Sequence, residues 1–127
     1  MNSKQMGLFG EKIARDYLEK KGYKILDQNY SRKQSSGPIK GEIDIVAKRR
    51  DVIAFVEVKA LTGNNQPISP EEKVNFPKQR KIIKTAQSWL IEKRIPLGSK
   101  WQIDIISIKI DLESKKAKIR HFENCVS

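Results

Sequence analysis

The sequence predicts a single α/β domain, in which about five strands and two helices follow one another in the order α-β-β-β-α-β-β. Two segments repeat apolar residues with helical spacing, one near the start of the chain and one after its middle. Short runs rich in valine and isoleucine lie between and after them, and such runs favour strands. At 127 residues the chain is expected to form one domain, 1–127, around a single core.

The first helix is expected over residues 3–21, because its apolar residues recur near the helical period and Gly22 then ends the pattern. A strand over 23–30 and a polar loop over 31–40 follow. Residues 61–76 are rich in glycine, asparagine and proline, so they predict a flexible loop.

The second helix is expected over residues 78–94, with Pro77 in its first turn. Its core-facing positions are Ile82, Ile83, Ala86, Trp89 and Leu90. Two strands over 101–110 and 116–122 can pair across a turn at 111–115, and we interpret them as scaffold strands.

The middle of the chain places charged residues in strand-forming sequence. Alternation along a strand puts Glu57 and Lys59 on one face and their apolar neighbours on the other. A hairpin whose turn is centred between Arg50 and Asp51 then sets Asp44 directly opposite Glu57. The sequence therefore predicts two carboxylates that face each other across neighbouring strands.

Facing carboxylates destabilise a strand pair unless a positive charge lies between them. Oxygen ligands that leave room for water and phosphate suit Mg²⁺ or Mn²⁺, so we predict one of these ions between Asp44 and Glu57. The alternative is a surface hairpin with a solvated charged face, in which Glu57 and Lys59 form an ordinary exposed ion pair.

Two further polar residues lean toward the predicted core from the helices. Glu11 lies at the edge of the buried face of the first helix, either as a third acid or as a glutamate favoured by the helix dipole. Gln79 turns inward near the start of the second helix, where its partner is either backbone or a water or phosphate.

The composition favours a polyanionic partner. Lysine and arginine number 26 against 15 acidic residues, which gives a formal charge of +11 and makes nucleic acid the first candidate. The longest clean apolar run, 52–56, is far too short to span a bilayer, and no signal core precedes it, so we expect a cytoplasmic protein without membrane contact. Cys125 has no partner for a disulfide, and the single histidine, His121, is expected in a strand.

Taken together, these segments resemble the PD-(D/E)XK nuclease superfamily. More closely, the chain is similar to the YraN family of small bacterial proteins, which are related to archaeal Holliday-junction resolvases. The stretches that carry the resemblance are Gly7-x-x-Gly10-Glu11-x-x-Ala14, Gly41-Glu42-Ile43-Asp44, Val56-Glu57-Val58-Lys59 and Lys78-Gln79-Arg80.

The resemblance implies a restriction-endonuclease-like fold with a central mixed sheet. It also implies Asp44 and Glu57 as metal ligands, and Lys59, Glu11 and Gln79 as further catalytic residues. The chain departs from the family pattern at two places: Leu61 stands where such sequences often carry arginine, and Gln102-Ile103-Asp104 stands where Arg-Phe-Asp is usual. These departures bear on substrate contacts more than on metal binding, and Asp104 is interpreted as structural.

The expected function is that of a Mg²⁺- or Mn²⁺-dependent endonuclease that hydrolyses phosphodiester bonds in DNA, including branched or structured DNA. The alternatives are a non-catalytic nucleic-acid-binding module with the same fold and a protein-interaction scaffold. A homodimer is left open. The basic residues expected to contact phosphates are Arg32, Lys33, Lys48, Arg49, Arg50, Lys78, Arg80 and Lys81.

Overall fold

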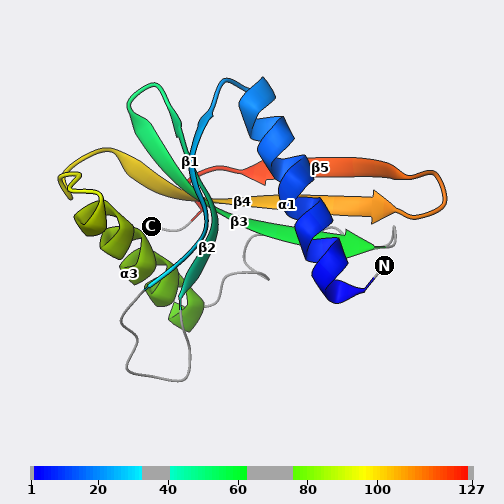
Figure 1. Cartoon of the computed structure of the whole chain (residues 1–127), viewed down its shortest axis with the longest axis horizontal. Coiled ribbons are helices and arrows are strands. Elements are labelled where there is room, and N and C mark those ends of the chain that lie inside the picture. Colours follow the sequence, from blue (N-terminus) through cyan, green and yellow to red (C-terminus); the bar gives the residue numbers. More distant parts are fainter. Residues whose placement is uncertain (1, 33–40, 63–75, 126–127) are drawn as a thin grey trace.

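The computed structural model describes residues 2–32, 41–62 and 76–125. Within them a five-stranded sheet carries one helix on each face (Figure 1). The elements in chain order are α1 (Ser3–Lys20), β1 (Lys24–Ser31), β2 (Glu42–Arg49), β3 (Val52–Thr62), α3 (Phe76–Glu92), β4 (Trp101–Asp111) and β5 (Lys116–Phe122). The predicted α/β class and the α-β-β-β-α-β-β order are confirmed.

The strands lie side by side in the order in which they occur in the chain, β1-β2-β3-β4-β5. Strands β3 and β4 are parallel, and every other neighbouring pair is antiparallel, so the sheet is mixed as expected. Helix α3 supplies the crossover that a parallel pair requires. Neither described helix has the length and apolar character needed to cross a membrane.

The element boundaries agree with the prediction to within about two residues, as is usual for helix and strand ends. The predicted loop over 61–76 extends too far at both ends, because residues 61–62 and 76 belong to regular elements. Leu61 and Thr62 continue β3 because they remain paired with β4, and Phe76 already belongs to α3. The rest of that loop, 63–75, lies outside the described residues.

The β2–β3 hairpin has the predicted register. Arg49 pairs with Val52 and Ile45 with Val56, and the turn between the strands contains Arg50 in a left-handed conformation, with φ of 57°. The next positions along this register are Asp44 and Glu57. The observed ladder ends at Ile45 and Val56, one step before these acids, so the placement of Asp44 directly opposite Glu57 stays a prediction.

Two hydrophobic clusters cover the two faces of the sheet. Strand β3 divides its side chains between them, since Ile53 and Phe55 belong to the cluster beneath α3 and Ala54 and Val56 to the cluster beneath α1. Helix α1 contributes Ala14 and Leu18, both with no exposed surface; helix α3 contributes Ile82, Ala86, Trp89 and Leu90. The sheet is thus buried on both faces along its centre.

Candidate functional site

Strands β2 and β3 separate at the open end of their hairpin. Among the described residues their ladder ends at Ile45 and Val56. Beyond this point β1 and β2 curve together toward α3, whereas β3 runs on beside β4 (Figure 1). Asp44 lies where the strands divide, and its Oδ2 atom accepts a hydrogen bond of 2.7 Å from the backbone N–H of Val58. A side-chain contact therefore bridges the two strands at the position where their ladder ends.

Glu57 and Lys59 lie on β3 just beyond this division. Val56, Val58 and Ala60 contribute to the cluster beneath α1, so alternation directs Glu57 and Lys59 to the other face, as predicted. Lys59 Nζ lies 3.1 Å from Glu57 Oε1, and their side chains are only 29% and 15% exposed. The pair is therefore much better shielded from water than an ordinary surface ion pair.

Glu11 reaches this region from α1. The helix approaches β3 closely at Gly10, where an added Cβ would lie 2.7 Å from the Cβ of Ala60. Glu11 follows Gly10 directly and is half-buried, as predicted for a residue at the edge of the buried face. Burial raises its pKa, a side-chain hydrogen bond with Asn29 lowers it, and the charge of Glu42 raises it further.

Asp44 has the most perturbed carboxyl group of the site. Burial is the main cause that raises its pKa to about 6, and the charges of Glu11, Glu57 and Glu42 act in the same direction. The hydrogen bond from Val58 opposes them. Asp44 therefore lies within electrostatic reach of three other acids, and the four come from α1, β2 and β3. We call Glu11, Glu42, Asp44 and Glu57 the acidic cluster.

The donor type of the acidic cluster suits a hard divalent cation, although no three of its four carboxylates belong to the described groups whose ligand atoms lie within 4.8 Å of one another. All four side chains offer carboxylate oxygens, which Mg²⁺ and Mn²⁺ prefer. Because burial makes an ionised Asp44 costly and its neighbours carry the same charge, a cation would relieve both effects at once. Asp44 and Glu57 would be its ligands, from the two strands that divide here.

Gln79 lies in the second turn of α3 and is half-buried. This helix leans on the start of β2 at Gly41, where an added Cβ would clash with Thr85 and lie 3.2 Å from the backbone oxygen of Lys81. The start of α3 is therefore held next to the residue that precedes Glu42. The catalytic role expected for Gln79 stays a prediction.

The basic residues expected to bind nucleic acid fall into two groups. Arg32 adjoins the end of β1, and Arg80 and Lys81 lie on the α3 turns beside Gly41, all at the open end of the hairpin. Lys48, Arg49 and Arg50 lie toward its closed end, from about 13 Å (Lys48) to about 20 Å (Arg50) from Asp44 at about 3.3 Å per strand residue. Lys33 and the side chain of Lys78 lie outside what the structure describes.

Arg49 is committed to contacts within the protein. Its guanidinium lies 4.6 Å from the centre of the Tyr23 ring and 3.7 Å from Glu123 Oε1. With Arg50 and Asp51 it lines a cavity of about 210 Å³ at the closed end of the hairpin. Lys48 and Arg50 are exposed there.

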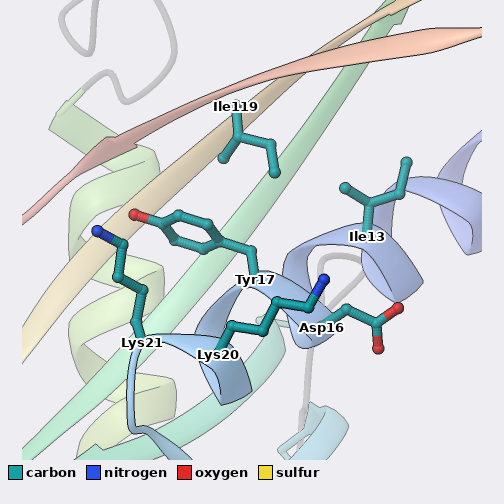
Figure 2. Close-up of a pocket in the computed structure, with 6 residues that line it drawn as sticks. All are labelled: Ile13, Asp16, Tyr17, Lys20, Lys21 and Ile119. Carbon is teal, nitrogen blue, oxygen red and sulfur yellow. The ribbon is translucent and has the colours of Figure 1, made fainter.

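A larger cavity of about 540 Å³ lies between α1 and β5, away from the predicted site residues (Figure 2). Its residues are Ile13, Asp16, Tyr17, Lys20, Lys21 and Ile119. Figure 2 shows the Tyr17 ring between the helix and Ile119, with the lysine side chains at the rim. None of the expected catalytic or metal-binding residues lines it.

A buried polar network links α1, β4 and β5. Asp104 has no exposed surface, and its Oδ2 atom lies 2.8 Å from Nε2 of His121. Its Oδ1 atom accepts hydrogen bonds from Gln102 Nε2 and the Asn124 N–H. Nδ1 of His121 lies 3.2 Å from the Tyr17 hydroxyl, so the imidazole bridges Asp104 and Tyr17. Atoms of Asp104, His121 and Glu123 that could bind a metal ion all lie within 4.8 Å of one another.

Sequence reasoning assigned no role to two residues of the site, Glu42 and Asn29. Glu42 precedes Asp44 by two positions on one strand, so alternation could have placed the two acids together. Asn29 has a φ of 51° within β1. Asparagine tolerates this left-handed region better than most residues, but a strand-like sequence gives no sign that it is used.

Comparisons with known proteins agree with the motifs. A model described as "Uncharacterised protein family UPF0102" matches residues 10–108. A UPF0102 protein of Clostridium beijerinckii is 41% identical over 96% of this chain and 93% of its own length. One from Alkaliphilus oremlandii is 40% identical over 96% and 97%, and one from Caldanaerobacter subterraneus subsp. tengcongensis is 40% identical over 98% and 96%. The chain therefore belongs to the UPF0102 family, also called YraN, the family that its motifs resemble.

Proposed function

We propose that this protein is a divalent-metal-dependent endonuclease that hydrolyses phosphodiester bonds in DNA. The observation that carries the proposal is the acidic cluster at the division of β2 and β3, with Lys59 Nζ 3.1 Å from Glu57. Burial raises the pKa of both Asp44 and Glu11, and carboxyl groups perturbed in this way beside a lysine are typical of catalytic sites. Mg²⁺ or Mn²⁺ bound there would supply polarisation of a phosphoryl oxygen and a more acidic bound water.

The protein's own residues divide the remaining work. Asp44 and Glu57 would hold the cation from opposite strands, and Glu11 would add a carboxylate from α1 that orients a metal-bound water. Gln79, at the start of α3, would position the attacking water or a phosphate oxygen. A phosphodiester gains negative charge as it is attacked, so the ammonium group of Lys59 would stabilise that charge.

Lys59 has a second role to test, because a lysine near a metal can also act as a general base. Arginine keeps the charge but cannot lose its proton at ordinary pH. Lys59→Arg therefore distinguishes the roles: retained cleavage indicates charge stabilisation, and lost cleavage with retained metal binding indicates proton transfer.

The basic groups at the two ends of the β2–β3 hairpin would contact different parts of one DNA molecule. Arg50 lies about 20 Å along the strand from Asp44, which corresponds to about six base pairs at a rise of about 3.4 Å. Such phosphate contacts position DNA without reading bases, so we expect preference for DNA structure, including branched DNA, over sequence.

The test is incubation of purified protein with branched, single-stranded and duplex DNA, with Mg²⁺, with Mn²⁺ or with a chelator. Glu57→Gln removes a proposed ligand without a large change in shape. Glu19→Gln is its matched control, because Glu19 is exposed on α1 and paired with Arg15 at 3.4 Å. We expect metal-dependent cleavage by the wild type and by Glu19→Gln, and none by Glu57→Gln.

Other outcomes assign the protein differently. DNA binding without metal-dependent cleavage would overturn the enzyme in favour of the non-catalytic nucleic-acid-binding module. Absence of DNA binding even at low salt would leave a protein-interaction scaffold. Cleavage that survives in Glu57→Gln would point to a contaminating nuclease or to another site.

A further inference from the structure

Side-chain alternation is interrupted on both β1 and β2 near Asp44, apart from the irregularity that β1 has between Ile25 and Asp27. Ile43 belongs to the cluster beneath α3, whereas Ile45, two residues later, belongs to the cluster beneath α1. Residues two apart on a regular strand point to the same face. The orientation therefore reverses at Asp44, which lies between them.

The paired strand reverses at the matching position. Tyr30 pairs with Ile43 and Gln28 with Ile45, so Asn29 is the residue opposite Asp44. Tyr30 faces α3, where its hydroxyl lies 3.2 Å from Ser88 Oγ. Asn29 has a φ of 51°, which is far from the strand region and turns its backbone away from regular pleating. Both strands thus change face at the Asn29–Asp44 position.

This reversal fixes the direction of the Asp44 side chain. Asp44 lies at this reversal, and its Oδ2 atom accepts a hydrogen bond from the Val58 N–H of β3. The side chain of Asn29 forms a hydrogen bond with Glu11 on α1. Asn29 therefore lies opposite one member of the acidic cluster, Asp44, and its side chain bonds to another, Glu11.

We propose that Asn29 is a positioning residue of the metal site, whose left-handed backbone turns Asp44 toward β3 and whose amide holds the Glu11 carboxylate in place. The effect of Asn29 on metal binding rests on the proposed function, whereas its effect on the direction of Asp44 does not. Asn29 would contact neither a bound ion nor the substrate.

Three substitutions separate the two contributions. Asn29→Gly allows the left-handed backbone and removes the amide, so it tests the Glu11 contact. Asn29→Ala removes the amide and also strains the backbone, because alanine disfavours positive φ. Asn29→Asp tolerates this φ better than alanine but replaces the amide donor with a carboxylate. Asn124→Ala is the matched control, since Asn124 has a φ of 50° and lies in the Asp104 network instead.

Two measurements are needed on the full chain: hydrogen exchange of the Val58 amide by NMR, and Mn²⁺ affinity by calorimetry. We expect Asn29→Gly to keep Val58 protected but to weaken Mn²⁺ binding about tenfold, as loss of an outer contact to a metal site does. Asn29→Ala should weaken binding further and also lose protection at Val58. Asn29→Asp should keep Val58 protected and weaken binding at least as much as Asn29→Gly. Asn124→Ala should change neither quantity.

Unchanged Val58 protection and Mn²⁺ affinity in Asn29→Ala would overturn the inference, and so would an equal loss in Asn124→Ala. If Asn29→Ala does not fold, Asn29→Gly decides, because wild-type affinity in that variant would remove the role of the amide. If the wild type binds no Mn²⁺, the proposed function fails, and Val58 exchange in Asn29→Ala still decides whether Asn29 directs Asp44.

Discussion

The Oδ2 atom of Asp44 lies 2.7 Å from the backbone nitrogen of Val58, so a carboxylate on β2 bonds to the backbone of β3 just past the end of their ladder. This contact consumes one lone pair of a carboxyl group whose pKa is raised to about 6. The Oδ1 atom takes no part in this contact. The free energy of unfolding should therefore depend on whether the Asp44 carboxyl group is ionised.

We expect Asp44→Asn to stabilise the metal-free protein at alkaline pH. The folded state holds the Asp44 proton more tightly than the unfolded chain, because the pKa is raised from 3.8 to about 6. This stabilisation is fully present below about pH 4 and is lost as the pH rises through 6, so ionised Asp44 costs on the order of 1–3 kcal/mol near pH 8. Asparagine avoids this cost and can still accept the Val58 N–H.

Thermal unfolding from about pH 4 to pH 8 measures the effect. The difference between Asp44→Asn and the wild type should be near zero at the acid end and should grow with pH. Saturating Mg²⁺ should then stabilise the wild type, by about 2.7 kcal/mol at 100 times its dissociation constant, and not the variant. A pH-independent difference would contradict the prediction.

The close approach of α1 to β3 predicts opposite effects for two glycines of one helix. An alanine at Gly10 would place its Cβ 2.7 Å from the Ala60 Cβ, which cannot swing aside, whereas nothing lies within 4 Å of a Cβ at Gly7. Gly10→Ala should cost about 1–3 kcal/mol by overpacking, and Gly7→Ala should gain about 0.5–1 kcal/mol in helix propensity. Urea unfolding checks both. Equal effects of the two substitutions on the free energy of unfolding would contradict the close packing of Gly10 against Ala60.

The Asp104 network predicts a stability role without a role in metal binding. Asp104 is fully buried and receives three hydrogen bonds, so Asp104→Ala should cost about 3–5 kcal/mol. The exposed Asp111, the last residue of β4, is the control, and its alanine variant should cost about 1 kcal/mol or less. Mn²⁺ affinity should stay unchanged in both. Loss of Mn²⁺ binding with normal stability in Asp104→Ala would contradict this assignment.

Cys125 should react slowly with thiol reagents. Burial, together with the charge of Asp104, raises its pKa to about 11, and its Sγ lies 3.5 Å from the Ile103 carbonyl oxygen. Only about one thiol in a thousand is then ionised at pH 8, and the thiolate is the reactive form. Labelling rates with and without denaturant measure this, and we expect at least a tenfold increase on unfolding. Equal rates would mean that the thiol is freely accessible.

DNA binding should depend on both ends of the β2–β3 hairpin only when the DNA is long enough to reach both. Arg80→Glu at the open end should weaken binding to all duplexes, while Arg50→Glu at the closed end should weaken binding only to duplexes longer than about six base pairs. Each substitution should also reduce the salt dependence of the affinity. Fluorescence anisotropy with duplexes of increasing length measures both effects.

Much of the site could be predicted from the sequence because its residues lie on regular elements. Alternation and a short turn determine the register of a hairpin, so the pairing from Arg49 with Val52 to Ile45 with Val56 could be predicted. Helical periodicity likewise gave the half-buried position of Glu11. These predictions use only neighbours along the chain or across one turn.

Contacts between distant elements could not be predicted in this way. Nothing in the sequence pairs His121 with Asp104, because that contact depends on how β4 and β5 align. The separation of Lys48, Arg49 and Arg50 from the acids follows from the hairpin itself, yet charge composition alone suggests one continuous basic surface. Asn29 was missed because a single left-handed residue within a strand leaves no periodic signal.

The parallel pairing of β3 with β4 gives the two sides of the site unequal stiffness. Ten residues of β3, from Ile53 to Thr62, pair with β4, so the backbone that carries Glu57 and Lys59 is braced along its whole length. The backbone that carries Glu42 and Asp44 leaves β3 halfway and leans on α3. A cation of different radius would therefore be accommodated by movement of the β1–β2 arm, while the lysine and its glutamate keep their positions.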